Sequence, residues 1–312
     1  MKKVLVTGAS GIIGKCVIKY LLSEGKYEIT IVDLKNHKST QALRKYRKRV
    51  NIVYGDITDS ILVDALVRDH DYIINLAGIN SPILDTTKEL LDMIDYKGCE
   101  NIIRAINFYN KKAHLIYISS ANMYTLNKTN TVSVSTKLEK KDTDYYNSAK
   151  EKIEKLIIDN LNNYTIFRTP MVLGPLDECS YLYDGYLNET VEFITDEDMG
   201  YAIAKSLDNI PKLNKGIYNL AGGQSCTILY KEFLSYVLKY YGISFKYIRR
   251  RVLCPYKKHG FIYKDGDKLD SILHFRNDSI LSYFMRQKRK YKNRQINIFL
   301  SKPFLRKLNK RP

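Results

Sequence analysis

The stretch Val4-Leu5-Val6-Thr7-Gly8-Ala9-Ser10-Gly11-Ile12-Ile13-Gly14 decides the fold of this chain. Residues 4–7 are an apolar run typical of a buried strand, and a helical pattern begins directly after the three glycines. A pyrophosphate can approach bare backbone N–H groups at a helix N-terminus, where the helix dipole favours negative charge and a Cβ would obstruct it. The alternative is a plain turn, but the strand–turn–helix context predicts a dinucleotide site.

The first half of the chain alternates apolar strand patterns with helical ones, as repeated βαβ units do. The strands are nearly continuous in apolar residues, which is typical of a parallel sheet covered on both faces. The sequence therefore predicts an α/β fold with a doubly wound, Rossmann-type parallel sheet. The expected strands are 4–7, 29–32, 51–54, 72–76, 114–119 and 164–168, and the expected helices include 87–109 and 144–161.

After Pro170 the alternation loosens, and we expect a helix over 195–207, a strand over 216–220 and a helix over 227–241. We predict three parts: a dinucleotide-binding domain over 1–169, a small substrate-binding lobe over 170–275 whose strands return to the core sheet, and a basic amphipathic tail over 276–312.

Composition narrows the class of protein. The chain has 312 residues with 45% hydrophobic and 27% charged residues, values of a globular protein. Its five cysteines form no CxxC pair, which argues against a disulfide framework or a zinc site and indicates a reducing, cytoplasmic location. No apolar run approaches 18 residues, and glycines interrupt any signal-peptide core after Met1. The five histidines are scattered, so no metal site is expected.

Asp33 ends the second predicted strand, 19 residues beyond Gly14. A carboxylate there can accept hydrogen bonds from the adenosine ribose and would repel a 2′-phosphate, which favours NAD over NADP. The alternative is an aspartate that caps a helix. Lys35 and Lys38 lie close by and would favour NADP.

Two further strand ends carry candidate cofactor contacts. Asp56 and Ile57 follow the third strand, where a carboxylate can meet the adenine amino group or, equally, cap the next helix. Leu76-Ala77-Gly78 ends the fourth strand, where small residues let the backbone pass close to a cofactor, although a plain turn is the alternative.

The fifth strand ends in Ser119-Ser120, and a helix opens around Tyr146, four residues before Lys150. Residues at i and i+4 share a helix face, and a nearby ammonium lowers the pKa of a phenol toward the working pH. A phenol so tuned can act as general acid or base on a hydroxyl or carbonyl. We therefore expect Ser120, Tyr146 and Lys150 to be catalytic, with Ser119 as the alternative serine.

The spacing of tyrosine and lysine is not specific by itself, because YxxxK also occurs at Tyr124–Lys128 and Tyr201–Lys205. Only Tyr146–Lys150 opens a helix that follows the strand-five serine in the dinucleotide-binding half. We interpret the other two pairs as ordinary surface or core residues.

Together these motifs resemble the extended short-chain dehydrogenase/reductase family, in its NAD-dependent epimerase/dehydratase branch, over about residues 2–225. The resemblance implies an enzyme that takes nucleotide-activated sugars and is usually dimeric through the helices near 90–108 and 146–160. The residues expected to hold NAD are Gly8, Ser10, Gly11, Ile12, Ile13, Gly14, Asp33, Asp56, Ile57, Leu76, Ala77, Gly78 and Lys150.

Departures from the family pattern narrow the chemistry. Dehydratases and decarboxylases of the family carry acidic residues just after the serine, where this chain has Ala121, Asn122 and Met123. We therefore expect 4-epimerisation or reduction of a 4-keto sugar, in surface polysaccharide synthesis. Met171 replaces a frequent asparagine, and Asp95 replaces the asparagine often seen before the glycine of the long helix.

The net charge of +18 is uneven, because 285–312 contain eleven Lys or Arg residues and no acid. The rest of the chain holds 40 basic against 33 acidic residues. Such a tail could be solvated, could lie on the inner face of an anionic membrane, or, with less support, could bind nucleic acid. The second hypothesis for the whole chain is a non-catalytic NAD-binding scaffold or sensor that the tail tethers.

Overall fold

The computed structural model describes residues 1–79, 87–125, 129–139, 145–176, 186–240 and 260–290. At its centre lies a seven-stranded sheet in the order β11-β7-β5-β4-β1-β2-β3, in which every pair is parallel. This confirms the predicted doubly wound sheet. The strands are β1 Lys2–Thr7, β2 Tyr27–Asp33, β3 Asn51–Tyr54, β4 Tyr72–Asn75, β5 His114–Ser120, β7 Tyr164–Thr169 and β11 Gly216–Asn219.

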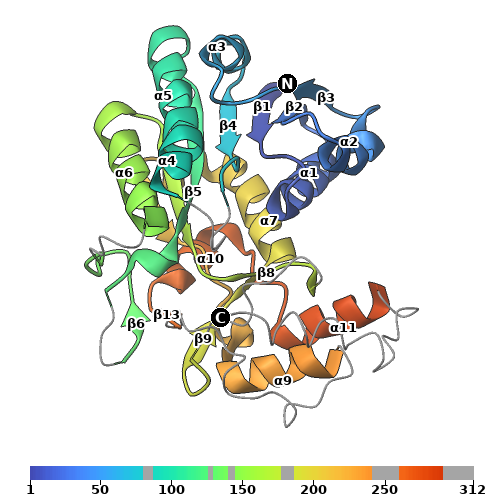
Figure 1. Cartoon of the computed structure of the whole chain (residues 1–312), viewed down its shortest axis with the longest axis vertical. Coiled ribbons are helices and arrows are strands. Elements are labelled where there is room, and N and C mark those ends of the chain that lie inside the picture. The colour runs from blue at the N-terminus through green and yellow to red at the C-terminus, as the bar shows by residue number, and fades with distance from the viewer. Residues whose placement is uncertain (80–86, 126–128, 140–144, 177–185, 241–259, 291–312) are drawn as a thin grey trace.

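Helices cover both faces of the sheet, as Figure 1 shows. One face is covered by α1 (Ile12–Glu24) and α7 (Asp196–Ser206), whose buried side chains join β1 and β2 in one apolar cluster. The other face is covered by α3 (Ser60–Arg68), α5 (Lys97–Tyr109) and α6 (Tyr145–Asn160) in a second cluster. Burial on both faces explains why the strands are apolar throughout.

The strand order reverses direction beside β1, whose neighbours are β2 and β4. Open α/β sheets bind ligands outside the carboxyl ends of their strands at such a switch point. The glycine-rich turn after β1 and the end of β4 meet there.

The long helix expected over 87–109 is present without a gap from Lys88 to Tyr109, but it contains a π turn. The chain forms α4 (Lys88–Leu91), a π-helical turn over Asp92–Tyr96, and then α5. Apolar spacing alone does not distinguish this from a regular helix, because a single π turn shifts the register by only one residue. The predicted helix over 227–241 also begins later, since Thr227–Leu229 forms strand β12 and α9 covers Tyr230–Tyr240.

Short paired strands lie below the main sheet in Figure 1, and all of them except β6 follow β7 in the chain. Aromatic residues of α9 and α11 (Ile280–Lys290) pack with Phe193 in a third apolar cluster. The pairs are β8 (Val172–Leu173) with β10 (Ile194–Thr195), β9 (Thr190–Glu192) with β12, and β6 (Thr131–Val132) with β13 (Ile262–Tyr263). The remaining described helices are α2 (His37–Leu43), α8 (Ile210–Leu213), α10 (Gly266–Leu273) and the 3-10 turns Arg44–Tyr46, Ala121–Met123, Leu207–Asn209 and Gln224–Cys226.

The three-part division at residues 169 and 275 stays a prediction, although β11 returns to the main sheet as expected. Most of the basic tail, residues 291–312, lies outside the described residues. Among the described helices, none has the length and apolar content needed to cross a membrane.

Candidate active site

The glycine-rich turn is tightly packed against the end of β4. Gly8 has a φ of +65°, and a Cβ on it would lie 2.7 Å from the carbonyl oxygen of Leu76. A Cβ on Gly14 would lie 2.6 Å from the Gly8 oxygen, whereas one on Gly11 would meet only that same oxygen at 3.2 Å. Gly8 and Gly14 are therefore required by the backbone itself. At Gly11 the surrounding atoms leave more room for a side chain. Gly11 is the N-cap residue of α1, and no side chain caps this helix end.

The first N–H groups of α1 thus have no side-chain acceptor and open toward the cavity, the arrangement that binds anions. This geometry fits a pyrophosphate, as the sequence predicts.

Asp33 fixes the turn to the end of β2. Its Oδ2 accepts a hydrogen bond from the Ser10 N–H at 2.7 Å, and its Oδ1 accepts one from the Leu34 N–H at 2.9 Å. The cap of the following helix is Asn36, whose side chain accepts from the Ser39 N–H. The alternative role of Asp33 as a helix cap is therefore wrong, and its carboxylate lies in the cavity wall.

Asp56 also lines the cavity without capping a helix. Its Oδ1 accepts the Thr58 N–H at 2.9 Å, while Asp59 caps α3 by accepting from Ile61 and Leu62. The capping alternative for Asp56 is wrong, since the cap lies three residues later.

A hydroxyl connects the ends of β1 and β4. Thr7 donates to the Asn75 side chain at 2.6 Å and accepts from the N–H groups of Leu76 and Ala77 at 3.1 and 3.0 Å. Thr7 and Asn75 are both buried. They hold Leu76-Ala77-Gly78 beside the glycine turn, at the place where the sequence predicts a contact with the cofactor.

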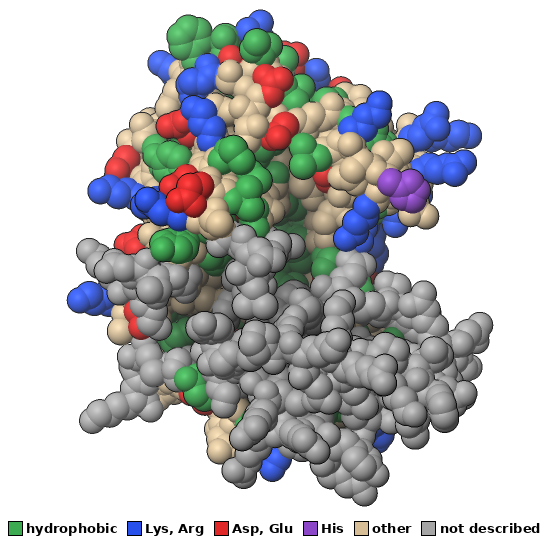
Figure 2. Space-filling model, viewed as in Figure 1, with side chains coloured by type: hydrophobic (Ala, Val, Ile, Leu, Met, Phe, Trp, Pro, Cys, Tyr) green, Lys and Arg blue, Asp and Glu red, His purple; other side chains and the backbone are tan. Residues whose placement is uncertain are grey.

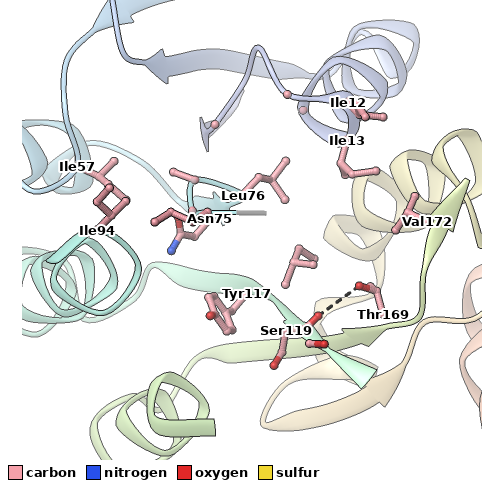
Figure 3. A pocket seen from close by; sticks show the side chains of 18 of the residues that line it. Ile12, Ile13, Ile57, Asn75, Leu76, Ile94, Tyr117, Ser119, Thr169 and Val172 are labelled. Atoms are coloured by element: carbon pink, nitrogen blue, oxygen red, sulfur yellow. Dashed lines mark hydrogen bonds between the residues drawn. The ribbon is translucent and has the colours of Figure 1, made fainter. Parts of the chain in front are cut away.

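Ser120 lies at the end of β5 and accepts the Asn122 N–H at 3.1 Å. Tyr146 and Lys150 lie one turn apart on α6, with the Lys150 Nζ 5.5 Å from the centre of the Tyr146 ring. All three line the same cavity. The neighbouring Ser119 lines it too, and its carbonyl oxygen accepts from the Thr169 hydroxyl at 3.3 Å (Figure 3).

Lys150 is 8% exposed and faces several polar groups. Its Nζ lies 3.3 Å from Asp95 Oδ2 and 5.2 Å from the centre of the Tyr117 ring. Burial alone would lower the pKa of Lys150, but Tyr117, Tyr146 and Asp95 outweigh it and raise that pKa above its usual value. The charged ammonium form of Lys150 is therefore favoured, and an activating cation beside a phenol requires that form.

The fifteen predicted site residues all line one cavity of about 610 Å³, which opens at the carboxyl ends of the strands. Figure 3 shows Ile12 and Ile13 on one side of it and Ile57 and Ile94 on the other. Apolar walls of this kind fit flat rings, and the polar groups at the glycine turn and at Lys150 fit a ligand with a charged centre.

Sequence reasoning missed several residues of the cavity wall, among them Tyr117, Asn75 and Thr169. Tyr117 points into the cavity from β5 in Figure 3. It lies two residues before Ser119, so strand alternation could have placed both on one face.

Of the other two YxxxK pairs, the described residues Tyr124, Tyr201 and Lys205 do not line this cavity. Tyr201 on α7 packs edge-on against Tyr20, with ring centres 5.3 Å apart, and Lys128 lies outside the described residues. Within the described ranges, no group of three or more His, Cys, Asp or Glu side chains could hold a metal.

The fold and the glycine turn define a dinucleotide-binding α/β protein. A family model described as the NAD dependent epimerase/dehydratase family matches residues 4–187. The chain belongs to this family, which confirms the predicted family and agrees with the expected NAD cofactor and enzyme class.

Curated and solved proteins of known activity are similar to the chain. GDP-6-deoxy-D-talose 4-dehydrogenase of Aggregatibacter actinomycetemcomitans is 28% identical over 187 residues, covering 56% of this chain and 52% of that protein. UDP-glucuronic acid 4-epimerase from Bacillus cereus in complex with NAD has a TM-score of 0.71 at 19% identity, covering 93% and 99%. The dTDP-glucose 4,6-dehydratase of Bacillus anthracis in complex with NAD has a TM-score of 0.76 at 17% identity, covering 95% and 98%.

The chain spans about half or less of the length of the curated relatives it matches. The structural matches, at these identities, support the fold.

Proposed function

We propose that the chain is an NAD-dependent enzyme that moves a hydride at a carbinol or ketone carbon of a nucleotide sugar, as a 4-epimerase or 4-ketoreductase. One observation carries this proposal. Tyr146, Lys150 and Ser120 line the same cavity as the glycine turn. The matched relatives that act at C4 of nucleotide sugars support the substrate class.

The cofactor, when bound, supplies the hydride acceptor or donor. The glycine turn and the N-terminus of α1 would hold its pyrophosphate, and Asp33 would accept from the adenosine ribose. Lys150 would hold the other ribose and keep the Tyr146 phenol acidic. These assignments make NAD the fitting dinucleotide, because the Asp33 carboxylate would repel a 2′-phosphate.

Tyr146 acts as the acid and base of the proposed reaction. As the phenolate it takes the proton of the sugar hydroxyl while the carbonyl forms, and as the phenol it returns that proton in the reverse direction. Ser120 positions the same oxygen by hydrogen bonding. A general acid or base of this kind contributes roughly 10²–10⁴-fold to the rate.

The turn after Ser120 offers no group for dehydration. The Ala121–Met123 turn presents no carboxylic acid, and Asn122 is the polar side chain of this turn that lines the cavity. A leaving hydroxyl at C6 needs a proton donor, so epimerisation or ketone reduction fits this site better.

Tyr146→Phe tests the function and separates it from a scaffold role. We expect turnover with UDP-, dTDP- or GDP-sugars to fall by about 10²–10⁴-fold, because the proton-transfer group is lost. Binding of NAD⁺, measured by calorimetry, should persist. The matched control is Tyr145→Phe, the exposed neighbour on the same helix.

Unchanged turnover in Tyr146→Phe would contradict the proposed mechanism. Retained biological activity with no turnover in either protein would favour the non-catalytic scaffold instead. Mass spectrometry of the purified chain for retained dinucleotide tests the cofactor directly.

The homodimer that the family resemblance implies belongs to the same proposal. Phe108 on α5 is 76% exposed and Ile158 on α6 is 42% exposed, although both are large apolar side chains. Exposed apolar surface of this kind is typical of protein interfaces. Sedimentation equilibrium would measure whether the chain is a monomer or a dimer. Contact of the basic tail with a membrane stays a prediction, which liposome co-sedimentation before and after deletion of 285–312 tests.

A further inference from the structure

The π-helical turn between α4 and α5 carries a buried carboxylate into the proposed active site. Single π turns inside helices occur often at functional sites. Here the turn contains Asp95, which is 3% exposed. Its Oδ1 accepts a hydrogen bond from the Ile79 N–H at 2.8 Å. The carboxylate is therefore fixed at the end of β4.

Glycine at position 78 makes room for this carboxylate. A Cβ on Gly78 would lie 3.0 Å from Asp95 Oδ2 and 3.1 Å from Oδ1, closer than ordinary contacts. The family motif at the end of β4 thus serves the carboxylate as well as the approach of a cofactor.

The second carboxylate oxygen faces Lys150. Asp95 Oδ2 lies 3.3 Å from the Lys150 Nζ, and no hydrogen-bond donor of the described residues reaches this oxygen. Lys150 lies on α6 and Asp95 on the π turn, so two elements bring the charges together. The ion pair is almost fully shielded from water, which strengthens the influence of each charge on the other.

Four titratable groups from four elements lie against the Lys150 ammonium: Asp95 from the π turn, Cys99 from α5, Tyr117 from β5 and Tyr146 from α6 itself. Burial raises the pKa of Cys99 to about 12, and burial also raises the pKa of Tyr117 far above its usual value. Both therefore stay neutral near pH 7. Of these four groups, Asp95 is the one carboxylate, and it forms the ion pair with Lys150.

We propose that Asp95 is a positioning residue that holds the Lys150 ammonium and offsets part of its charge, and so sets the pH range in which Tyr146 exchanges its proton. This inference rests on the proposed function, in which Tyr146 is the acid and base. An asparagine at position 95 could still accept from Ile79 but would leave the lysine charge uncompensated. The phenolate of Tyr146 would then be more stable.

The test follows the ionisation of Tyr146 itself and needs no substrate. The absorbance of phenolate near 295 nm is titrated in the wild type and in Tyr146→Phe, and the difference reports Tyr146. The same difference is then measured between Asp95→Asn and the double variant Asp95→Asn/Tyr146→Phe. We expect the Tyr146 midpoint to move down by about one pH unit or more, as loss of an adjacent like charge does.

Glu100→Gln is the matched control, because it removes one carboxylate from the same helical region. Glu100 contacts the exposed Lys97 at 2.6 Å and leaves the Lys150 site untouched. Its Tyr146 midpoint should equal that of the wild type. Asp95→Glu keeps the charge and should keep the midpoint near the wild-type value.

Asp95→Ser removes the charge with a smaller side chain, and we expect the same downward shift of the Tyr146 midpoint. This variant replaces Asp95→Asn in the test if the asparagine variant fails to fold. An unchanged or raised midpoint in both uncharged variants would overturn the proposal. If a nucleotide sugar is turned over, the acid limb of kcat/KM moves down in parallel. Absence of turnover with a shifted midpoint would refute the proposed function and leave the role of Asp95 standing.

Discussion

At the scale of single residues, the glycines of the first turn have different tasks although they belong to one motif. Gly8 needs its positive φ and its close approach to the Leu76 carbonyl, so the backbone itself excludes a side chain there. Gly11 has a negative φ of −63° and fewer neighbours. Gly11 lines the cavity that is proposed to hold the dinucleotide.

The pair Gly8→Ala and Gly11→Ala separates these tasks. We expect Gly8→Ala to lower the free energy of unfolding by about 1–3 kcal/mol, because strained φ and a clash with backbone combine. Gly11→Ala should change it by less than about 1 kcal/mol, the range of an unstrained surface substitution, and yet weaken NAD⁺ binding at least about tenfold. Urea denaturation and calorimetry measure the two quantities. Equal losses of stability in both variants would refute the distinction.

At the scale of elements, a buried ion pair connects α6 to the main sheet. The Arg168 guanidinium on β7 donates to Glu154 on α6 through Nε at 3.0 Å and through Nη2 at 2.7 Å. Its Nη1 also donates to the Tyr124 hydroxyl at 3.3 Å, and Tyr124 donates to Asn219 on β11. The network positions α6, and therefore Tyr146 and Lys150, relative to β7.

Glu154→Gln should destabilise the chain by about 3–5 kcal/mol, because it leaves the buried Arg168 charge without its anion. Arg168 and Glu154 are 5% and 3% exposed, so water cannot replace the lost partner. Thermal and urea unfolding measure the effect, with Glu151→Gln on the same helix as control. If Glu154→Gln lowers the free energy of unfolding no more than Glu151→Gln does, the ion pair does not stabilise the position of α6.

At the scale of the whole molecule, basic residues gather on a second surface besides the C-terminal tail. Seven Lys or Arg residues and no acid lie between Leu34 and Gly55, and all seven are exposed. They cover α2 and the adjoining 3-10 turn, on the outer edge of the face seen in Figure 2. Most of the excess charge lies in the tail, as the sequence predicts, but this second basic surface was not among the predicted features.

Asp198 connects α7 to the segment between α10 and α11. Its carboxylate on α7 accepts from the N–H groups of Asn277 and Asp278 at 3.2 and 3.1 Å. Burial raises the pKa of Asp198 from 3.8 to about 6. The folded state therefore binds a proton more tightly than the unfolded state does.

The contribution of Asp198 to stability is consequently greatest below about pH 4 and is lost as the pH rises through about 6. A shift of this size corresponds to about 2–3 kcal/mol. Asp198→Asn should flatten the fall in unfolding free energy between these pH values, relative to the wild type, in urea titrations. A parallel pH dependence in the two proteins would contradict the assignment.

Much of this molecule was predictable from the sequence because its signals are local. Strand burial, the glycine spacing and the i, i+4 pair on α6 depend on a few adjacent residues, and they determined the parallel sheet, the dinucleotide turn and the fifteen cavity residues. The boundaries were less certain where two local patterns compete. Thr227–Leu229 has both a helical apolar spacing and strand propensity, and pairing with β9 decides for the strand.

Other features needed the tertiary structure because they depend on residues far apart in the chain. The π turn contains Asp95, which meets a lysine 55 positions later. Tyr117 becomes a neighbour of that lysine only when β5 lies beneath α6. The sequence by itself thus determined which dinucleotide-binding fold forms and where its strands end. The three-dimensional packing alone decided which buried charges meet, since electrostatic influence depends on distance in space and on exclusion of water.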